Sequence, residues 1–154
     1  MPSHSFIHLP TIIVTSVLLS LLSSCSQSPP STIGLNNGHL RPCPASPNCV
    51  NSEAQKPQHK IAPLTIDAPS TEKMNTLFQV ISSMPLTTLQ KRENNYLWFS
   101  VKTPFMRFTD DLEVFLDHQG KVQVRSASRL GHSDFNANRN RVEQLRTKLL
   151  ENKR

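Results

Sequence analysis

The first 40 residues contain no Asp, Glu, Lys or Arg, although the 154-residue chain carries 17 basic and 11 acidic side chains. The chain also has no long uninterrupted hydrophobic segment. A bilayer-spanning helix needs about 20 apolar residues, and the apolar run at residues 11–22 is shorter. Charge begins at Arg41, so the composition separates an uncharged leader from a basic domain. The net charge of +6 favours anionic partners such as phospholipid head groups, acidic glycans or nucleic acid.

The apolar run has the length of a signal-peptide core, and it ends in the residues LSSC, of which Cys25 is the last. This ending resembles a lipobox, the bacterial motif in which lipid is attached to the cysteine before cleavage. We therefore expect residues 1–24 to be a lipoprotein signal peptide and Cys25 to carry acyl chains such as palmitate. The usual basic residues are missing from residues 1–10, which offer only His4 and His8. The alternatives are a buried helix or a leader that is cut elsewhere.

Residues 25–40 are rich in Ser, Pro, Gly and Asn, which predicts a flexible tether ahead of a single domain at residues 41–154. Cys25 is followed by Ser rather than by the Asp that tends to retain lipoproteins in the inner membrane. We therefore expect a protein of the bacterial cell envelope that is anchored by lipid, at the outer membrane rather than the inner one.

Cysteine is scarce, and once Cys25 is set aside only Cys43 and Cys49 remain. Export to an oxidising compartment favours a disulfide between them, and two intervening prolines favour turns that bring the pair within bridging range. We interpret the bridge as a structural staple. A redox pair normally has the shorter C-x-x-C spacing, and a metal site with His39 or His59 lacks a recognisable ligand spacing. We expect no metal and no cofactor.

Hydrophobic periodicity predicts the element order β-α-β-β-β-β-α. Residues 59–64 are expected to form a short edge strand. A helix is expected at 70–84 with Ser70 as its N-cap, and another at 136–152 with Asp134 or Asn136 as its cap. Four further strands are predicted, at residues 86–92, 96–103, 110–117 and 121–128. This order indicates an α+β fold, with an antiparallel sheet of four to five strands backed by two helices.

The turn at residues 118–120 fixes the register of the last two predicted strands. In that register Glu113 faces Arg125, and Asp111 is diagonal to both Arg125 and Arg129. These four charged side chains should share one face of the sheet. Adjacent residues of a strand point to opposite faces, so Asp110 should lie on the other face and should not form an acid–base pair with Asp111.

The charged region admits two interpretations. Arginines grip carboxylates or phosphates through paired hydrogen bonds, and a helix N-terminus favours an anion, so the region is a candidate ligand site. Alternatively, a network of ion pairs pins the strand hairpin to the last helix. A buried pocket lined by both Arg125 and Arg129 would favour binding. The candidate ligand-binding residues are Asp110, Asp111, Arg125, Ser126, Ser128, Arg129, Asp134, Asn138, Arg139 and Arg141.

Catalytic motifs are missing. There is no G-x-S-x-G elbow and no glycine-rich phosphate loop, and Ser126 and Ser128 have only His132 as a nearby base. We assign no catalytic residue; the alternative is an envelope hydrolase that uses Asp110 and Asp111 with the two arginines. Nucleic acid is not expected as a partner of an exported protein.

Four segments together resemble the uncharacterised domain-of-unknown-function family 1499: CPASPNCV from Cys43, TDDLE from Thr109, RSASRLGHSD from Arg125 and NRNRVE from Asn138. The resemblance spans about residues 43–150. It implies an envelope domain, often of a lipoprotein, and no known activity. His132 stands where the family usually has Tyr, and Asn136 stands where it usually has Gly, a mild change because Asn tolerates left-handed backbone geometry. We therefore expect a membrane-anchored domain that binds an anionic envelope ligand or a protein partner.

Overall fold

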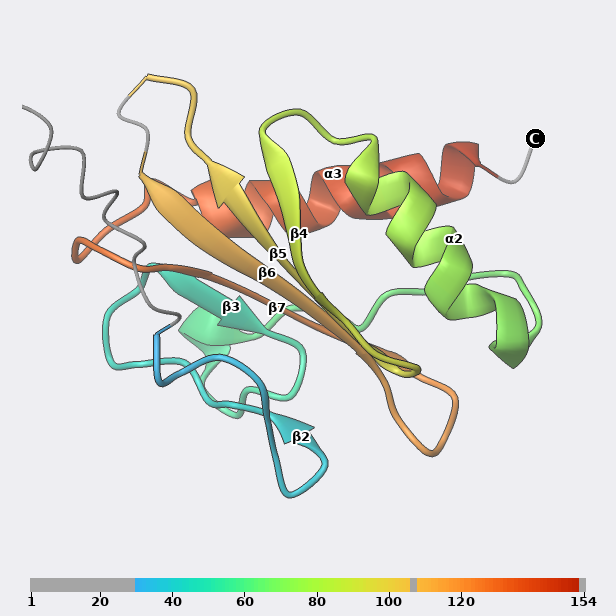
Figure 1. Cartoon of the computed structure of the whole chain (residues 1–154). Helices are drawn as coiled ribbons and strands as arrows, with labels where there is room; N and C mark the ends of the chain where they lie inside the picture. The colour runs from blue at the N-terminus through green and yellow to red at the C-terminus, as the bar shows by residue number, and fades with distance from the viewer. Residues whose placement is uncertain (1–29, 106–107, 153–154) are drawn as a thin grey trace, which may run out of the picture.

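The computed structural model describes residues 30–105 and 108–152, and the predicted signal peptide and Cys25 lie outside these residues. Five antiparallel strands form one sheet (Figure 1). From one edge to the other the order is β3 (Cys49–Asn51), β7 (Val122–Ser128), β6 (Thr109–Leu116), β5 (Tyr96–Lys102) and β4 (Thr87–Arg92). Two helices and an antiparallel five-stranded sheet confirm the predicted α+β fold.

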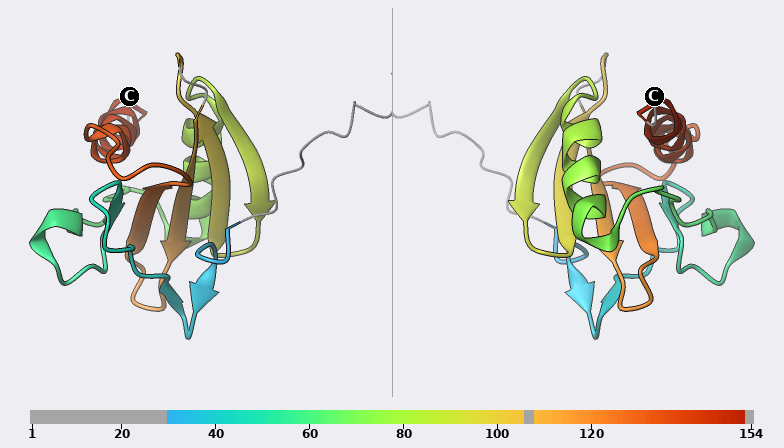
Figure 2. Two further views of the ribbon diagram at one scale, coloured as in Figure 1. Left: turned by 90° about the vertical axis from the view of Figure 1, so that its left-hand side faces the viewer. Right: turned by 90° about the vertical axis from the view of Figure 1, so that its right-hand side faces the viewer.

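Helices α2 (Ser70–Ser82) and α3 (Ala137–Glu151) pack on one face of the sheet (Figure 2). Helix α2 buries Met74, Leu77 and Ile81, whose helical spacing gave the prediction. These side chains join the apolar residues that alternate along β5, β6 and β7. The resulting core lies between the helices and the sheet, and its burial drives folding.

The opposite face of the sheet is covered by a small hairpin, formed by β1 (Leu35–Asn36) and β2 (His39–Leu40). The apolar side chains of the hairpin pack, together with Ile33, against the aromatic side chains on this face of the sheet, Tyr96, Trp98 and Phe115. The segment predicted as a tether, residues 25–40, thus contains a hairpin in contact with the sheet. Among the described residues, both hydrophobic clusters lie between Ile33 and Leu149, so we expect a chain that begins at Pro30 to keep both clusters and to fold.

Two local predictions are wrong. The edge strand is β3, whereas residues 59–64 make only isolated bridges from Lys60 and Leu64, because Pro63 has no N–H to extend a ladder. Helix α2 has Pro69 at its N-cap, and Ser70 is its first helical residue rather than its cap. No helix among residues 30–105 and 108–152 is long and apolar enough to cross a membrane.

The predicted register of the last two strands is confirmed. Glu113 faces Arg125 and Asp111 faces Ala127 across the β6–β7 pair. The turn between these strands is held by Asp117, whose carboxylate accepts hydrogen bonds from the backbone N–H groups of Gln119 and Lys121. Burial alone would raise the pKa of Asp117, but these bonds and one from Gln123 lower it below its ordinary value.

Candidate functional site

Strands β6 and β7 carry charged side chains on both faces, and these form two separate clusters. The hairpin-side cluster lies under β1 and β2 and consists of Tyr96, Trp98, Asp111, Glu113, Arg125 and Arg129. The helix-side cluster lies against α3 and consists of Asp110, Ser126, Ser128, Asp134, Asn138 and Arg141. The separation follows from the alternation of side chains along a strand, as predicted for Asp110 and Asp111.

Two ion pairs form the centre of the hairpin-side cluster. Arg125 Nη1 donates to Glu113 Oε2 at 2.7 Å, and both side chains are buried. Arg129 donates through Nε and Nη2 to the two oxygens of Asp111, at 3.0 and 2.8 Å. The second pair has the planar bidentate geometry that fixes an arginine most strongly. All four charged residues predicted to share a face therefore do so.

Aromatic residues of β5 complete the hydrogen bonding of both carboxylates. Tyr96 donates its hydroxyl to Glu113 Oε1, and Trp98 donates its indole N–H to Asp111 Oδ1, each at 2.8 Å. The backbone N–H of Gly34 also donates to Glu113, which ties the N-terminal segment to the sheet. Burial raises the pKa of Tyr96 far above its usual range, and the negative charge of Glu113 adds to this shift.

The helix-side cluster is centred on Arg141 of α3. Its guanidinium donates to Asp110 Oδ2 through Nη2, and to Ser126 Oγ and Asn138 Oδ1 through Nη1. Arg141 and Asp110 are both buried. A buried ion pair is stable only when its remaining polar atoms are also bonded, and Ser126 and Asn138 provide these bonds here.

Asn138 connects this cluster to the disulfide loop. Its side-chain amide donates to the backbone oxygen of Asn48, to Ser128 Oγ and to Asp134 Oδ2, at 2.8–3.0 Å. Asp134 Oδ2 also accepts the backbone N–H of Asn138 and so satisfies one donor in the first turn of α3. Asn136 occupies the N-cap position without a side-chain cap bond, and its φ of 66° is a left-handed geometry that Asn tolerates.

One candidate residue lies apart from both clusters. The guanidinium of Arg139 donates to the backbone oxygens of Gln58 and Lys60, on the surface beside the 3-10 turn η2 (Pro57–His59). Arg139 therefore joins two surface segments and makes no hydrogen bond to either cluster in the described part of the chain.

A cavity of about 300 Å³ opens beside the hairpin-side cluster, and both Arg125 and Arg129 line it. We call it the arginine-lined cavity. Three segments bound it, at residues 30–32, 44–48 and 125–131, and Asp111 contributes the remaining wall. The cavity is open to solvent rather than buried, so the lining by both arginines meets only part of the condition that would favour the binding interpretation.

Arg125 retains an unused donor. Its Nε is buried and has no hydrogen-bond acceptor among the residues that the structure describes. A buried donor without an acceptor costs about 1–3 kcal/mol, and the Nε of Arg41, which does not line this cavity, is in the same state. Arg129 likewise has Nη1 beyond the two nitrogens that bind Asp111.

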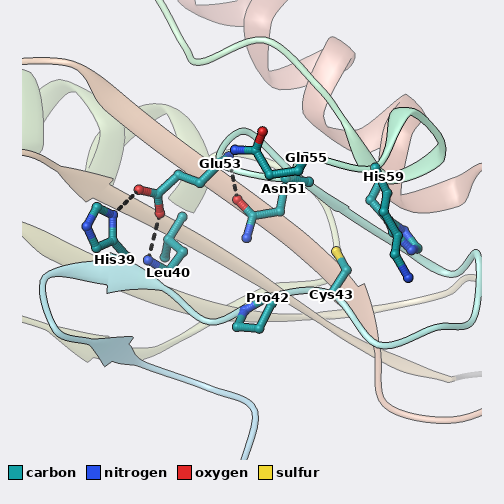
Figure 3. Close-up of a pocket in the computed structure, with 10 residues that line it drawn as sticks. His39, Leu40, Pro42, Cys43, Asn51, Glu53, Gln55 and His59 are labelled. Carbon is teal, nitrogen blue, oxygen red and sulfur yellow. Dashed lines mark hydrogen bonds and ion pairs between the residues drawn. The ribbon is translucent and has the colours of Figure 1, made fainter.

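A second cavity of about 460 Å³ lies between residues 39–43 and residues 51–59 (Figure 3). Glu53 accepts hydrogen bonds from the backbone N–H of Leu40 and contacts the ring of His39, which holds the hairpin in place. Figure 3 shows His39 and His59 at opposite ends of the cavity. Within the described parts of the chain, no three His, Cys, Asp or Glu side chains are grouped to hold a metal ion.

The predicted disulfide joins Cys43 to Cys49, with the two Cα atoms 5.7 Å apart. Cys49 begins β3, where it faces Ala127 of β7. The bridge therefore fixes the loop that carries Ser46 and Asn48, two residues of the arginine-lined cavity. Its position at the end of a strand agrees with a structural staple.

Tyr96, Trp98 and Asn48 received no role in the sequence analysis, although the sequence contains a signal for the two aromatic residues. Alternation along β5 places Tyr96 and Trp98 on the face opposite to Leu97 and Phe99, and the register of β5 with β6 then puts Trp98 beside Glu113. Asn48 had no such signal, because its partner Gly131 lies 83 residues away in the sequence.

One protein-family model, described as "Protein of unknown function (DUF1499)", matches residues 39–149. The matched segment contains both clusters and the disulfide. No curated protein matches the chain.

Proposed function

The chain belongs to the DUF1499 family, whose function is unknown, and we propose that it is an exported lipoprotein whose domain binds a small carboxylate in the arginine-lined cavity. The observation that carries the proposal is that Arg125 and Arg129, each paired with one carboxylate, both line the same cavity. A ligand oxygen within the cavity would accept hydrogen bonds from guanidinium N–H groups that these carboxylates leave unused.

The charge balance of the cavity selects the class of ligand. Glu113 offsets Arg125 and Asp111 offsets Arg129, so these four groups contribute no net charge. A doubly charged anion would therefore meet nearby carboxylates without a surplus of positive charge. A carboxylate carries one negative charge over two oxygens, which suits the remaining donors of the two arginines.

Ser46 and Ser128 also line the cavity and offer hydroxyl groups to a polar ligand. Both lie on segments held by other bonds: Ser46 by its contact with Asn48, and Ser128 by the amide of Asn138. A site built from side chains that are already oriented loses less entropy on binding than a flexible one.

The catalytic alternative receives no support from this geometry. Asp110 lies in the helix-side cluster and Asp111 in the hairpin-side cluster, so they cannot act on one substrate from one side. Each carboxylate is bonded to its own arginine, which disfavours proton transfer by either. Binding is therefore the better proposal.

Export and anchoring rest on two features. The disulfide is typical of proteins that fold in an oxidising compartment. The sequence places an apolar leader and a lipobox-like cysteine before the domain. A Cys25→Ser variant should leave the membrane fraction, whereas the unaltered chain should remain in it; equal membrane retention of both would contradict lipid anchoring at Cys25.

Titration calorimetry of the chain from Pro30 onward with acetate, succinate and phosphate tests the binding site. We expect saturable binding of acetate. Arg129→Lys should weaken this binding about ten-fold, because lysine keeps the positive charge but lacks the paired N–H donors of the guanidinium group. Arg146→Lys is the matched control, because Arg146 donates to the backbone oxygens of Ala62 and Pro63, outside the cavity. Equal affinity of both variants, or no saturable binding, would contradict the proposal.

A further inference from the structure

An apolar patch lies at one end of the sheet, where the β5–β6 connection and the β7–α3 connection meet (Figure 1). It consists of Phe105, Phe108, Leu130 and Phe135, which all line one cavity of about 260 Å³. Phe105 and Phe135 have 96% and 92% of their surface exposed. Single exposed hydrophobic residues are ordinary, but a contiguous group of large ones marks a surface that meets an apolar partner.

The backbone at Phe135 adds a second observation. Its φ is 51°, a left-handed conformation that is unfavourable for a bulky side chain. Such a conformation costs on the order of 1–2 kcal/mol. Because Phe135 is almost fully exposed, the fold gains little packing from this ring in return. A strained residue that projects an aromatic ring into solvent indicates a role outside the folded core.

The N-terminal end of the described domain lies at a cavity that adjoins the cavity of this patch. Pro30 lines the arginine-lined cavity, which shares Ser128 and Gly131 with the cavity of the apolar patch. The two cavities are therefore neighbours. Only four residues lie between Cys25 and Pro30, and each of the five steps along an extended chain covers about 3.5 Å. The cysteine can thus lie no more than about 18 Å from Pro30.

We infer that the apolar patch rests on the surface of the phospholipid bilayer that holds the anchor. This inference depends on the lipidation of Cys25 in the proposed function. Because the β1–β2 hairpin packs on the sheet, the free part of the predicted tether is too short to hold this end of the domain far from the membrane. Exposed Phe and Leu side chains at that end enter the boundary between head groups and acyl chains.

Orientation follows from this contact. The arginine-lined cavity opens next to the patch, since the two share wall residues, so its ligand would reach it close to the head groups. The anchor supplies the affinity for the membrane, because acyl chains contribute about 0.8 kcal/mol per buried CH₂. The patch then selects which side of the domain faces the lipid.

Flotation of the chain from Pro30 onward with vesicles of equal parts phosphatidylethanolamine and phosphatidylglycerol tests the inference without the anchor. We expect the bound fraction to fall about ten-fold for the double variant Phe105→Ser with Phe135→Asn, since about 1.4 kcal/mol of lost apolar burial corresponds to that factor. Asn suits the left-handed backbone at position 135. The matched control is Leu86→Ser with Leu150→Ser, which removes two other exposed hydrophobic side chains and should leave the bound fraction unchanged.

Three results would overturn the inference: no vesicle binding by the unaltered domain, equal loss in both double variants, or a dimer in sedimentation experiments that the phenylalanine substitutions dissociate. Equal melting temperatures of the variants ensure that a change in binding is not a loss of folding. Because this chain lacks Cys25, a negative result in the flotation experiment does not affect the anchoring test with Cys25→Ser or the carboxylate titration. The proposed function is therefore tested separately.

Discussion

Glu113 and Arg125 face each other across β6 and β7 in full burial, with 2.7 Å between Oε2 and Nη1. Two further donors, Tyr96 and the backbone of Gly34, complete the bonds of the carboxylate. The arginine, by contrast, keeps a buried Nε without an acceptor among the described residues. The hydrogen bonds of the Glu113 carboxylate are thus complete, whereas Arg125 has a donor without an acceptor among the described residues. Arg125 also lines the arginine-lined cavity.

Substitution of the acidic partner should be severe. Glu113→Gln leaves the charge of Arg125 buried without compensation, and we expect the free energy of unfolding to fall by about 3–5 kcal/mol in urea denaturation. Glu93→Gln is the matched control: its exposed pair with Lys91 should contribute about 0–1 kcal/mol. Adding Arg125→Met to Glu113→Gln should recover part of the loss. A loss below about 1 kcal/mol for Glu113→Gln would show that the pair does not stabilise the fold.

Asn138 should be the most sensitive neutral residue of the helix-side cluster. Asn138→Ala removes its bonds to Asn48, Ser126 and Arg141 and leaves buried partners unsatisfied, so we expect a loss of about 3 kcal/mol in thermal or urea unfolding. Asn140→Ala, at an exposed position of the same helix, should change stability by less than about 0.5 kcal/mol. Similar effects of the two substitutions would contradict the role given to Asn138.

The disulfide should stabilise the domain and be inaccessible to reagents. Chain-entropy estimates for so short a loop give about 2 kcal/mol, which reduction or the double variant Cys43→Ser with Cys49→Ser should remove. In the native chain from Pro30 onward a thiol reagent should label neither cysteine. Reductant should have no effect on the unfolding of the double variant. Labelling of Cys43 or Cys49 without reductant would contradict the bridge.

Tyr96 should limit stability at high pH. Its folded pKa lies above the unfolded value of about 10, so its contribution is fully present below pH 10 and is lost as the pH rises above that value. The chain has a single tyrosine, so the absorbance of phenolate reports this residue alone. We expect phenolate to appear only as the domain unfolds, and Tyr96→Phe to unfold less steeply above pH 10. Titration of Tyr96 near pH 10 in the folded domain would contradict this prediction.

The parts of the fold that are determined locally could be predicted from the sequence. The turn before Lys121 fixes the register of β6 and β7, and that register brought Glu113 to Arg125 and Asp111 near Arg129. The helices followed from apolar spacing that matches 3.6 residues per turn.

Other elements depend on contacts that are distant in the sequence. Strand β3 has three residues and is stabilised by pairing with the edge of β7. Its sequence is too short to show a strand pattern, so the longer run at residues 59–64 was predicted as the edge strand instead. The β1–β2 hairpin did leave a signal: Asn37-Gly38 is a strong two-residue turn, and both residues have positive φ. Its composition nevertheless resembled that of a tether.

The arginine-lined cavity could not be predicted, because three distant segments enclose it. Residues 30–32 reach it through the hairpin, residues 44–48 through the disulfide, and residues 125–131 through β7. Alternation along a strand predicts which face a side chain occupies, but not which loop lies above it.

An NMR titration that follows the Nε–H groups of the arginines tests the central claim most directly. As acetate is added to the chain from Pro30 onward, the Nε–H signal of Arg125 should shift and saturate, because an anion bound in the cavity would lie against this guanidinium. The Nε–H signal of Arg146, which already donates to Glu143, should stay in place. A signal of Arg125 that does not move, or that moves without saturation in parallel with Arg146, would contradict binding in the arginine-lined cavity.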